Sequence, residues 1–61
     1  MSTQPLASAG YRAGYAEGER TAASDPGLAQ RIASIAHLHH PADRAQGYVD
    51  AVRTATEETS R

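Results

Sequence analysis

The spacing of hydrophobic and polar positions along the chain predicts three helices and no strand. Apolar residues recur at helical intervals rather than at every second position, and β-branched residues are scattered. The expected helices span about residues 5–23, 26–39 and 41–58, with frayed ends at 1–4 and 59–61. The sequence therefore predicts an all-α fold in one small domain, either a short helical hairpin or a three-helix unit.

Prolines mark the two expected boundaries between helices. Asp25 followed by Pro26 is typical of an N-cap with proline at the first helical position. Pro41 again fits a helix start, and it disfavours helical backbone at His40. We expect the middle helix to end near His39, and a single long helix kinked at Pro41 is the alternative.

The second and third expected helices are amphipathic. In the second, Leu28, Ile32 and Ile35 share one face at positions i, i+4 and i+7, with Arg31 and Leu38 at its margin. The third has an apolar stripe that consists of Ala45, Tyr48, Val49, Val52 and Ala55. Its opposite, polar face consists of Gln46, Asp50, Arg53, Thr54 and Glu57.

The first expected helix has a stripe of small residues instead. These residues are spaced by four and are Gly10, Gly14, Gly18 and Ala22. Tyr11 and Tyr15 run beside them. Each helical glycine costs about 0.8–1 kcal/mol relative to alanine, so three cost about 2–3 kcal/mol. Close approach of another backbone, or a ring lying on the stripe, would offset that cost; the alternative is a segment that is loosely helical or disordered in isolation.

Residues 14–22 and 47–55 form an internal repeat. Five of the nine positions are identical, and the offset from Gly14 to Gly47 is 33 residues. Within each copy, a tyrosine and small residues share one face, while an acid and an arginine lie at i and i+3 on the other. Chance similarity in an alanine-rich chain is one interpretation.

The repeat supports two further interpretations. In the first, its tyrosines are packing residues, and Glu17–Arg20 and Asp50–Arg53 are solvated pairs, each worth about 0.2–0.5 kcal/mol. In the second, the two copies line a shared binding surface, because tyrosine and arginine are enriched at interface hot spots. The candidate ligand-binding residues are then Tyr15, Arg20, Tyr48 and Arg53.

The chain has few large apolar side chains from which to build a core. It has 61 residues, no Phe, no Trp and no Cys, so neither disulfides nor thiolate zinc sites support it. Domains of this size are marginal alone, and we expect a homo-oligomer or docking on a protein partner, with partial disorder as the alternative. The expected contact residues are Gly10, Tyr11, Gly14, Gly18, Leu28, Ile32 and Ile35.

Charge and hydropathy argue against nucleic-acid and membrane partners. The net charge is −1, and the six basic residues are all Arg, which with the many alanines is typical of a GC-rich genome such as that of an actinobacterium or one of its phages. Nucleic-acid binding is disfavoured because the chain is not basic. No apolar run approaches the roughly 20 residues of a membrane span. The N-terminus lacks the features of a signal peptide, so we expect a cytoplasmic protein without a membrane partner.

Three histidines lie close together at the expected end of the second helix. His37, His39 and His40, with Asp43, include the ligand types of a first-row metal site. On a helix, however, His37 and His39 point in different directions, and the spacing is not the i, i+4 pair of a helical zinc site. We therefore expect no metal. A pH-sensitive junction and a simple polar helix end are the remaining interpretations.

No residue pattern indicates catalysis. The serines do not occur in a nucleophile-elbow sequence, and the glycines neither follow a strand nor precede a lysine, as in a phosphate-binding loop. We expect a protein without catalytic residues or a cofactor.

One short run resembles a known family. Gln46-Gly47-Tyr48 followed by Arg53 is similar to the last helix of small phage helical-hairpin proteins that sequester cyclic nucleotide signals. The resemblance implies nucleotide binding. The rest of the chain departs from that family, because it is shorter, lacks Lys and has glycines where a long first helix is expected.

Together these patterns predict a small non-enzymatic helical interaction protein, such as an inhibitor, adaptor or regulator, acting through an oligomeric surface. The first alternative is a protein that binds a small molecule or nucleotide at subunit interfaces, with tyrosines stacking on a flat group and Arg20 or Arg53 binding an anion. The second is a small DNA-binding or transcription-regulatory dimer, against which the near-neutral charge argues.

Overall fold

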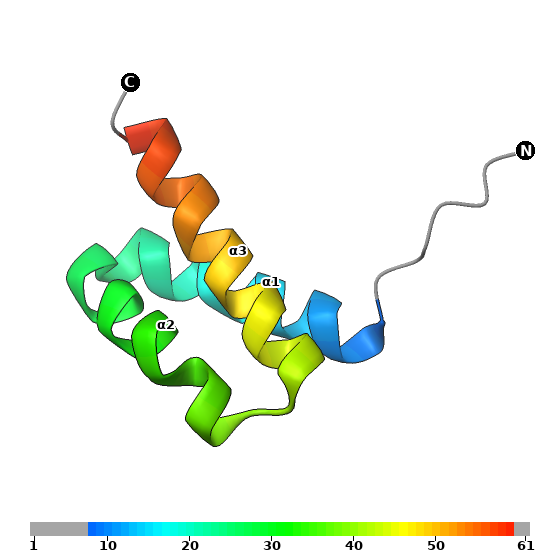
Figure 1. Ribbon diagram of the computed structural model, residues 1–61. Coiled ribbons are helices and arrows are strands. Elements are labelled where there is room, and N and C mark those ends of the chain that lie inside the picture. The colour runs from blue at the N-terminus through cyan, green and yellow to red at the C-terminus, as the bar shows by residue number, and fades with distance from the viewer. Residues whose placement is uncertain (1–7, 60–61) are drawn as a thin grey trace, which may run out of the picture.

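The computed structural model describes residues 8–59, which form three helices in the order α1 (Ala9–Ser24), α2 (Pro26–His39) and α3 (Ala42–Thr59) (Figure 1). No strand occurs in this part of the chain, so the predicted all-α class is confirmed. The predicted start of the first helix at residue 5 and the predicted fraying of 1–4 and 60–61 lie outside the described residues. Thr59, which was also expected to fray, is instead the last residue of α3.

Side-chain caps and prolines set the helix ends. Ser8 Oγ accepts a hydrogen bond from the Tyr11 amide at 3.0 Å, so α1 begins at Ala9. Asp25 ends α1 through its amide, which donates to the Thr21 carbonyl at 2.7 Å, and its side chain caps α2 by accepting from the Leu28 amide at 3.1 Å. One residue therefore forms the whole connection between the two helices.

At Pro41 the helix is interrupted rather than kinked. The residue before it, His40, is extended, with φ −131° and ψ 157°. This is the conformation that a following proline favours, and it separates α2 from α3.

The closest packing in the molecule is between α1 and α3. A Cβ atom added at Gly14 would overlap the carbonyl oxygen of Arg44, and one added at Gly47 would overlap that of Tyr11. At Gly18 it would lie 2.8 Å from the Tyr48 carbonyl oxygen. The glycines thus let two backbones approach more closely than any side chain would allow.

This crossing changes the expectation for the glycine stripe. Gly14 and Gly18 are buried against α3 of the same chain, and the space beside Gly10 is taken by the Asp43 carboxylate, 2.6 Å from an added Cβ. The stripe is therefore occupied within one chain and is not open to a second copy.

The two copies of the internal repeat meet at the crossing of α1 and α3. Gly14 packs against Arg44, and Gly47 packs against Tyr11. Gly47 lies 33 positions after Gly14, and Tyr11 lies 33 positions before Arg44, so the two contacts are equivalent under the repeat. Gly18 contacts its own counterpart, Ala51. The two copies of the repeat therefore pack on each other about a local pseudo-twofold axis.

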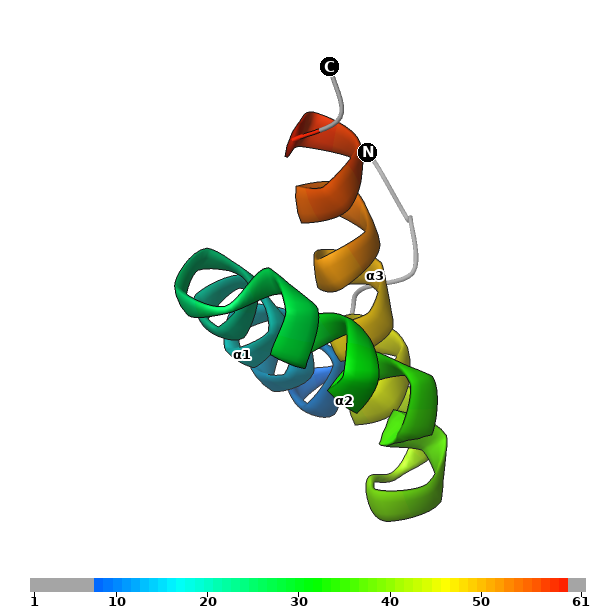
Figure 2. The ribbon, with the colours of Figure 1, turned by 90° about the vertical axis from the view of Figure 1, so that its left-hand side faces the viewer.

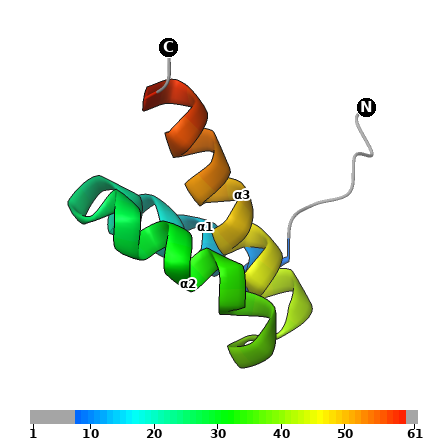
Figure 3. The ribbon, with the colours of Figure 1, turned by 60° about the vertical axis from the view of Figure 1, so that its left-hand side comes forward.

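The remaining helix, α2, packs through its alanines against one side of the α1–α3 pair. Ala29 and Ala36 are its buried residues, and Ala29 packs in a small core with Tyr48, Val52 and Ala22. Figures 2 and 3 show α2 against the other two helices, with the C-terminal turns of α3 extending beyond both. The core is built mainly from small side chains, as the close α1–α3 crossing requires.

The large aliphatic residues of α2 lie outside this core. Leu28, Ile35 and Leu38 are 40%, 44% and 80% exposed, while Ile32 is half-buried. At 100° per residue, their stripe is turned about a quarter of the helix circumference from Ala29 and Ala36. The predicted amphipathic face of α2 thus exists, but most of it faces outward rather than toward α1 and α3.

Candidate functional site

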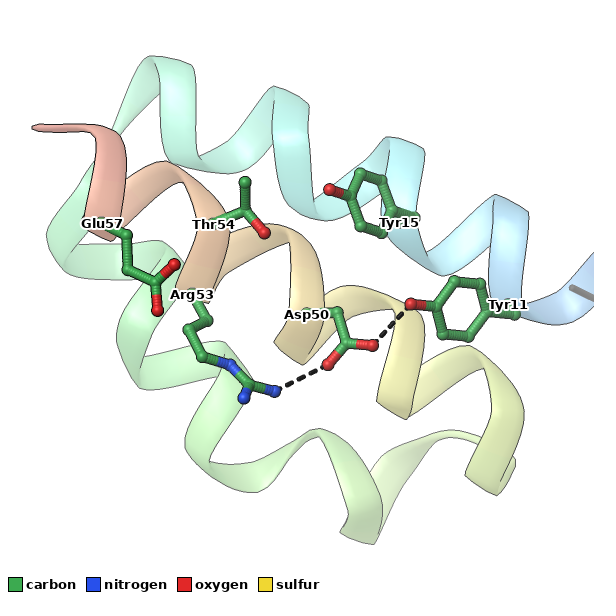
Figure 4. Close-up of a pocket in the computed structure, with 6 residues that line it drawn as sticks. All are labelled: Tyr11, Tyr15, Asp50, Arg53, Thr54 and Glu57. Atoms are coloured by element: carbon green, nitrogen blue, oxygen red, sulfur yellow. Dashed lines mark hydrogen bonds and ion pairs between the residues drawn. The ribbon is translucent and has the colours of Figure 1, made fainter.

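An open hollow lies between α1 and α3, with two tyrosines on one wall and polar side chains on the other (Figure 4). Its volume is about 510 Å³. The residues that line it are Tyr11, Tyr15, Asp50, Arg53, Thr54 and Glu57. The rings of Tyr11 and Tyr15, one helical turn apart, are tilted by 30° with centroids 6.1 Å apart.

Asp50 is the most heavily hydrogen-bonded residue of the hollow. The Tyr11 hydroxyl donates to Asp50 Oδ2 at 2.5 Å, and Oδ1 accepts from Gln46 Nε2 and Arg53 Nη2, each at 2.8 Å. The Tyr11 hydroxyl is the main cause that lowers the pKa of Asp50, with smaller contributions from Gln46 and Arg53. In return, the hydrogen bond to Asp50 raises the pKa of Tyr11.

The charges of the hollow favour donors and cations over anions. Arg53 is already paired with Asp50, and Glu57 adds a further carboxylate, so the lining carries one positive and two negative groups. A guanidinium that holds a carboxylate is less available to a second anion. This arrangement gives less support to anion binding at Arg53 than the sequence suggested.

The structure separates the four residues predicted to bind a ligand. Tyr15 and Arg53 line the hollow, but Tyr48 is 4% exposed in the core, and its hydroxyl has no hydrogen-bond partner among residues 8–59. Arg20 is exposed on α1 and does not line the hollow. The four side chains therefore do not converge on one site.

The acid–arginine pairs are arranged differently from the prediction. Asp50 pairs with Arg53 on its own helix, as the spacing suggested, at 2.8 Å. Glu17 instead pairs across the crossing with Arg44, at 2.9 Å, and within residues 8–59 it has no salt bridge to Arg20. This cross-helix pair is the pseudo-twofold counterpart of the Tyr11–Asp50 hydrogen bond.

Sequence reasoning missed Tyr11, Asp50, Thr54 and Glu57 as lining residues. The repeat offset was a signal that could have found part of this set. If the two copies pack face to face about Gly14 and Gly47, the residue three positions before one glycine lies next to the acidic residue three positions after the other glycine. That rule pairs Tyr11 with Asp50 and Arg44 with Glu17, as observed.

The histidines at the end of α2 do not form a metal centre. His37 and His39 are exposed and His40 is half-buried. Between Ser8 and Thr59, no three His, Cys, Asp or Glu side chains are placed to hold a metal ion together. Nor does any helix over this range combine the length and the apolar character needed to cross a bilayer.

Comparison with known proteins adds no assignment. The chain matches no protein-family model, and no curated protein or solved structure is significantly similar to it.

We predict a loss of stability in acid. Asp43, whose pKa is lowered chiefly by the Ser8 hydroxyl, joins Asp50 in having a folded-state pKa below the ordinary value of 3.8. Stability from both carboxylates is present above that value and is lost as the pH falls through the lower folded-state values. Urea unfolding at pH values from neutral to strongly acidic checks this, and Asp50→Asn should flatten the acid limb. An Asp50→Asn curve with an unchanged acid limb would contradict the assignment.

Proposed function

We propose that this protein is a small non-enzymatic interaction protein, an adaptor, inhibitor or regulator, that works as a homodimer joined through α2. The observation that carries the proposal is the exposure of Leu28, Ile35 and Leu38 on one face of that helix. Exposed apolar residues are ordinary when scattered, but a contiguous patch is typical of an interaction site.

The composition of the chain makes this exposure more informative. Large aliphatic side chains are scarce, and no large side chain is fully buried among residues 8–59. The helix nevertheless directs its alanines inward and most of its large aliphatics outward. Burial of these aliphatic side chains in an interface with another molecule would add the apolar contact that the single chain lacks.

A second copy fits this surface for two reasons. In an antiparallel pair of α2 helices, Leu28 of one chain lies near Ile35 of the other, so the face is self-complementary as a twofold interface requires. The same arrangement brings the Asp25 end of one helix toward the His39 end of the other. The net charge of −1 is small, but Arg31 lies at the margin of this face, so in the pair its guanidinium has to extend into solvent.

The dimer is tested by single charges on the α2 face. We expect the wild type to elute as a dimer at micromolar concentration in size exclusion with light scattering. Ile35→Glu or Leu38→Glu should weaken the dimer at least tenfold, because fully burying such a side chain is worth about 1.5–3 kcal/mol. His37→Glu is the matched control, since it places a carboxylate at an exposed position on the side of α2 away from Ile35.

The control should remain dimeric. A wild-type protein that is a cooperatively folded monomer at this concentration would refute the proposal. So would a dimer that is equally insensitive to all three substitutions.

A further inference from the structure

A second hollow, distinct from the α2 face, opens along the C-terminal parts of α1 and α3. Its volume is about 400 Å³. Small side chains form much of it, with a tyrosine and glutamates around them. The lining includes Tyr15, Glu19, Ala22, Ala51, Ala55 and Glu58.

The pseudo-twofold axis relates this hollow to the groove that α2 fills. The counterpart of Tyr15 is Tyr48, and Ala22 and Ala55 are counterparts of each other. Tyr48 and Ala22 belong to the core cluster that includes Ala29 of α2, and Ala55 packs against it. The α1–α3 pair therefore has two related grooves: α2 fills one, and no other helix between Ser8 and Thr59 fills the second.

Two further positions support the correspondence. Ala23, which also lines the open hollow, has Thr56 as its counterpart, and Gln30 of α2 donates to Thr56 Oγ1 at 3.3 Å. Glu58 has Asp25 as its counterpart, the residue that caps α2. The residues that contact or cap α2 are thus the counterparts, 33 positions away, of residues that line the open hollow.

The two grooves differ in charge. Val52 lies in the core of the filled groove, and its counterpart in the open hollow is Glu19. Glu58 also lines the open hollow. Neither glutamate has a salt bridge within the part of the chain that the structure describes. A helix in the open hollow would therefore be favoured by a cation next to Glu19 and Glu58.

We propose that this hollow binds a helix of a partner protein, one that presents alanine-sized residues to the hollow and a Lys or Arg to Glu19 and Glu58. The small residues follow from the way Ala29 fits the related groove, and helix-in-groove binding is a recurring recognition mode. The basic residue follows from the two unpaired carboxylates.

The α2 helix of a second copy fits the hollow less well than such a partner. The residues of α2 near Val52 include Gln30, Ala33 and Ser34, none of which is a cation. Its one arginine, Arg31, is exposed and lies on the opposite side of the helix from Ala36. A second copy would leave Glu19 without a partner, and this proposal does not depend on the dimer.

Two synthetic peptides test the proposal against the full-length protein. Both have the sequence of residues 24–40 with Leu38→Glu, which keeps them off the α2 face, and one, the Lys peptide, also has Ala33→Lys, which would place an amine beside Glu19. In fluorescence anisotropy with labelled peptide at low salt, we expect the Lys peptide to bind at least tenfold more tightly than the peptide that keeps Ala33.

Substitutions in the hollow identify the binding site. Glu19→Val makes the hollow resemble its filled counterpart, so the preference should reverse in favour of the peptide that keeps Ala33. Glu57→Val removes an exposed glutamate of the neighbouring hollow and should leave both affinities unchanged. Leu38→Glu, on the α2 face, should also leave them unchanged.

Three results would overturn the proposal. They are the absence of binding by either peptide, a preference that Glu19→Val does not alter, and binding that Leu38→Glu abolishes, which would place the peptide on the α2 face. If Glu19→Arg instead dissociates a wild-type dimer that Leu38→Glu leaves intact, a second copy occupies the hollow and the partner helix is refuted. The light-scattering measurement of the α2 dimer is separate, so failure of either proposal is recognised by itself.

Discussion

Gly14→Ala is expected to destabilise the protein by about 2–3 kcal/mol, the upper part of the range for overpacking a well-packed interior. The sign is informative, because alanine in a helix normally stabilises by about 0.8–1 kcal/mol relative to glycine. Here the new methyl group would overlap the backbone carbonyl oxygen of Arg44. A backbone atom cannot rotate away as a side chain can, so α1 and α3 would have to separate along their whole contact.

The measurement is urea unfolding followed by far-UV circular dichroism at one fixed protein concentration, since association shifts apparent stability. Gly27→Ala is the matched control. Gly27 is also helical, but an added Cβ would meet only Asp25 Oδ1, at an ordinary 3.7 Å. The control should be as stable as the wild type or more stable. If Gly14→Ala behaves like Gly27→Ala, the close crossing is refuted.

The glycine stripe illustrates how far local sequence could predict this fold. Its spacing indicated that another backbone comes close, and the energetic argument for offsetting the glycines was sound. What the stripe did not contain was the identity of that backbone. A second copy and α3 of the same chain satisfy the same steric requirement, and only the tertiary arrangement distinguishes them.

The orientation of α2 was not predictable for a related reason. Helical periodicity identified Leu28, Ile32 and Ile35 as one face, which the structure retains. Which face of a helix meets the core, however, depends on the space available. With α1 and α3 held close together by glycines, the third helix packs through Ala29 and Ala36, and the larger residues are left mostly outside.

The candidate site shows the same limit. The repeat treated Tyr15 and Tyr48 as equivalent, and about the α1–α3 axis they are. A single α2 helix covers only one of the two related grooves, so it buries Tyr48 and leaves Tyr15 half-exposed. Pattern matching along the chain could not distinguish the two, because the asymmetry comes from a segment between the copies.

This asymmetry yields the second prediction of large effect. Tyr48→Ala should cost about 3–5 kcal/mol, the range for removing a buried aromatic ring. Domains have stabilities of about 0.05–0.15 kcal/mol per residue, or about 3–9 kcal/mol for 61 residues, so this loss is a large part of the total stability. Tyr15→Ala, at the pseudo-equivalent position, should change stability far less, because its half-exposed ring supports a hollow rather than the core. The same unfolding assay compares both variants.

Tyr48→Phe separates the ring from its hydroxyl and guards against a variant that only fails to fold. The hydroxyl is buried without a hydrogen-bond partner in the part of the chain that the structure describes, and leaving such a group unpaired costs about 1–3 kcal/mol. Removing it should therefore raise stability, by about 1 kcal/mol when compensating water is allowed for. A Phe variant clearly less stable than the wild type would show that the hydroxyl is hydrogen-bonded in solution. Equal losses in Tyr15→Ala and Tyr48→Ala would refute the distinction between a filled and an open groove, because both rings would then have to be buried to the same extent.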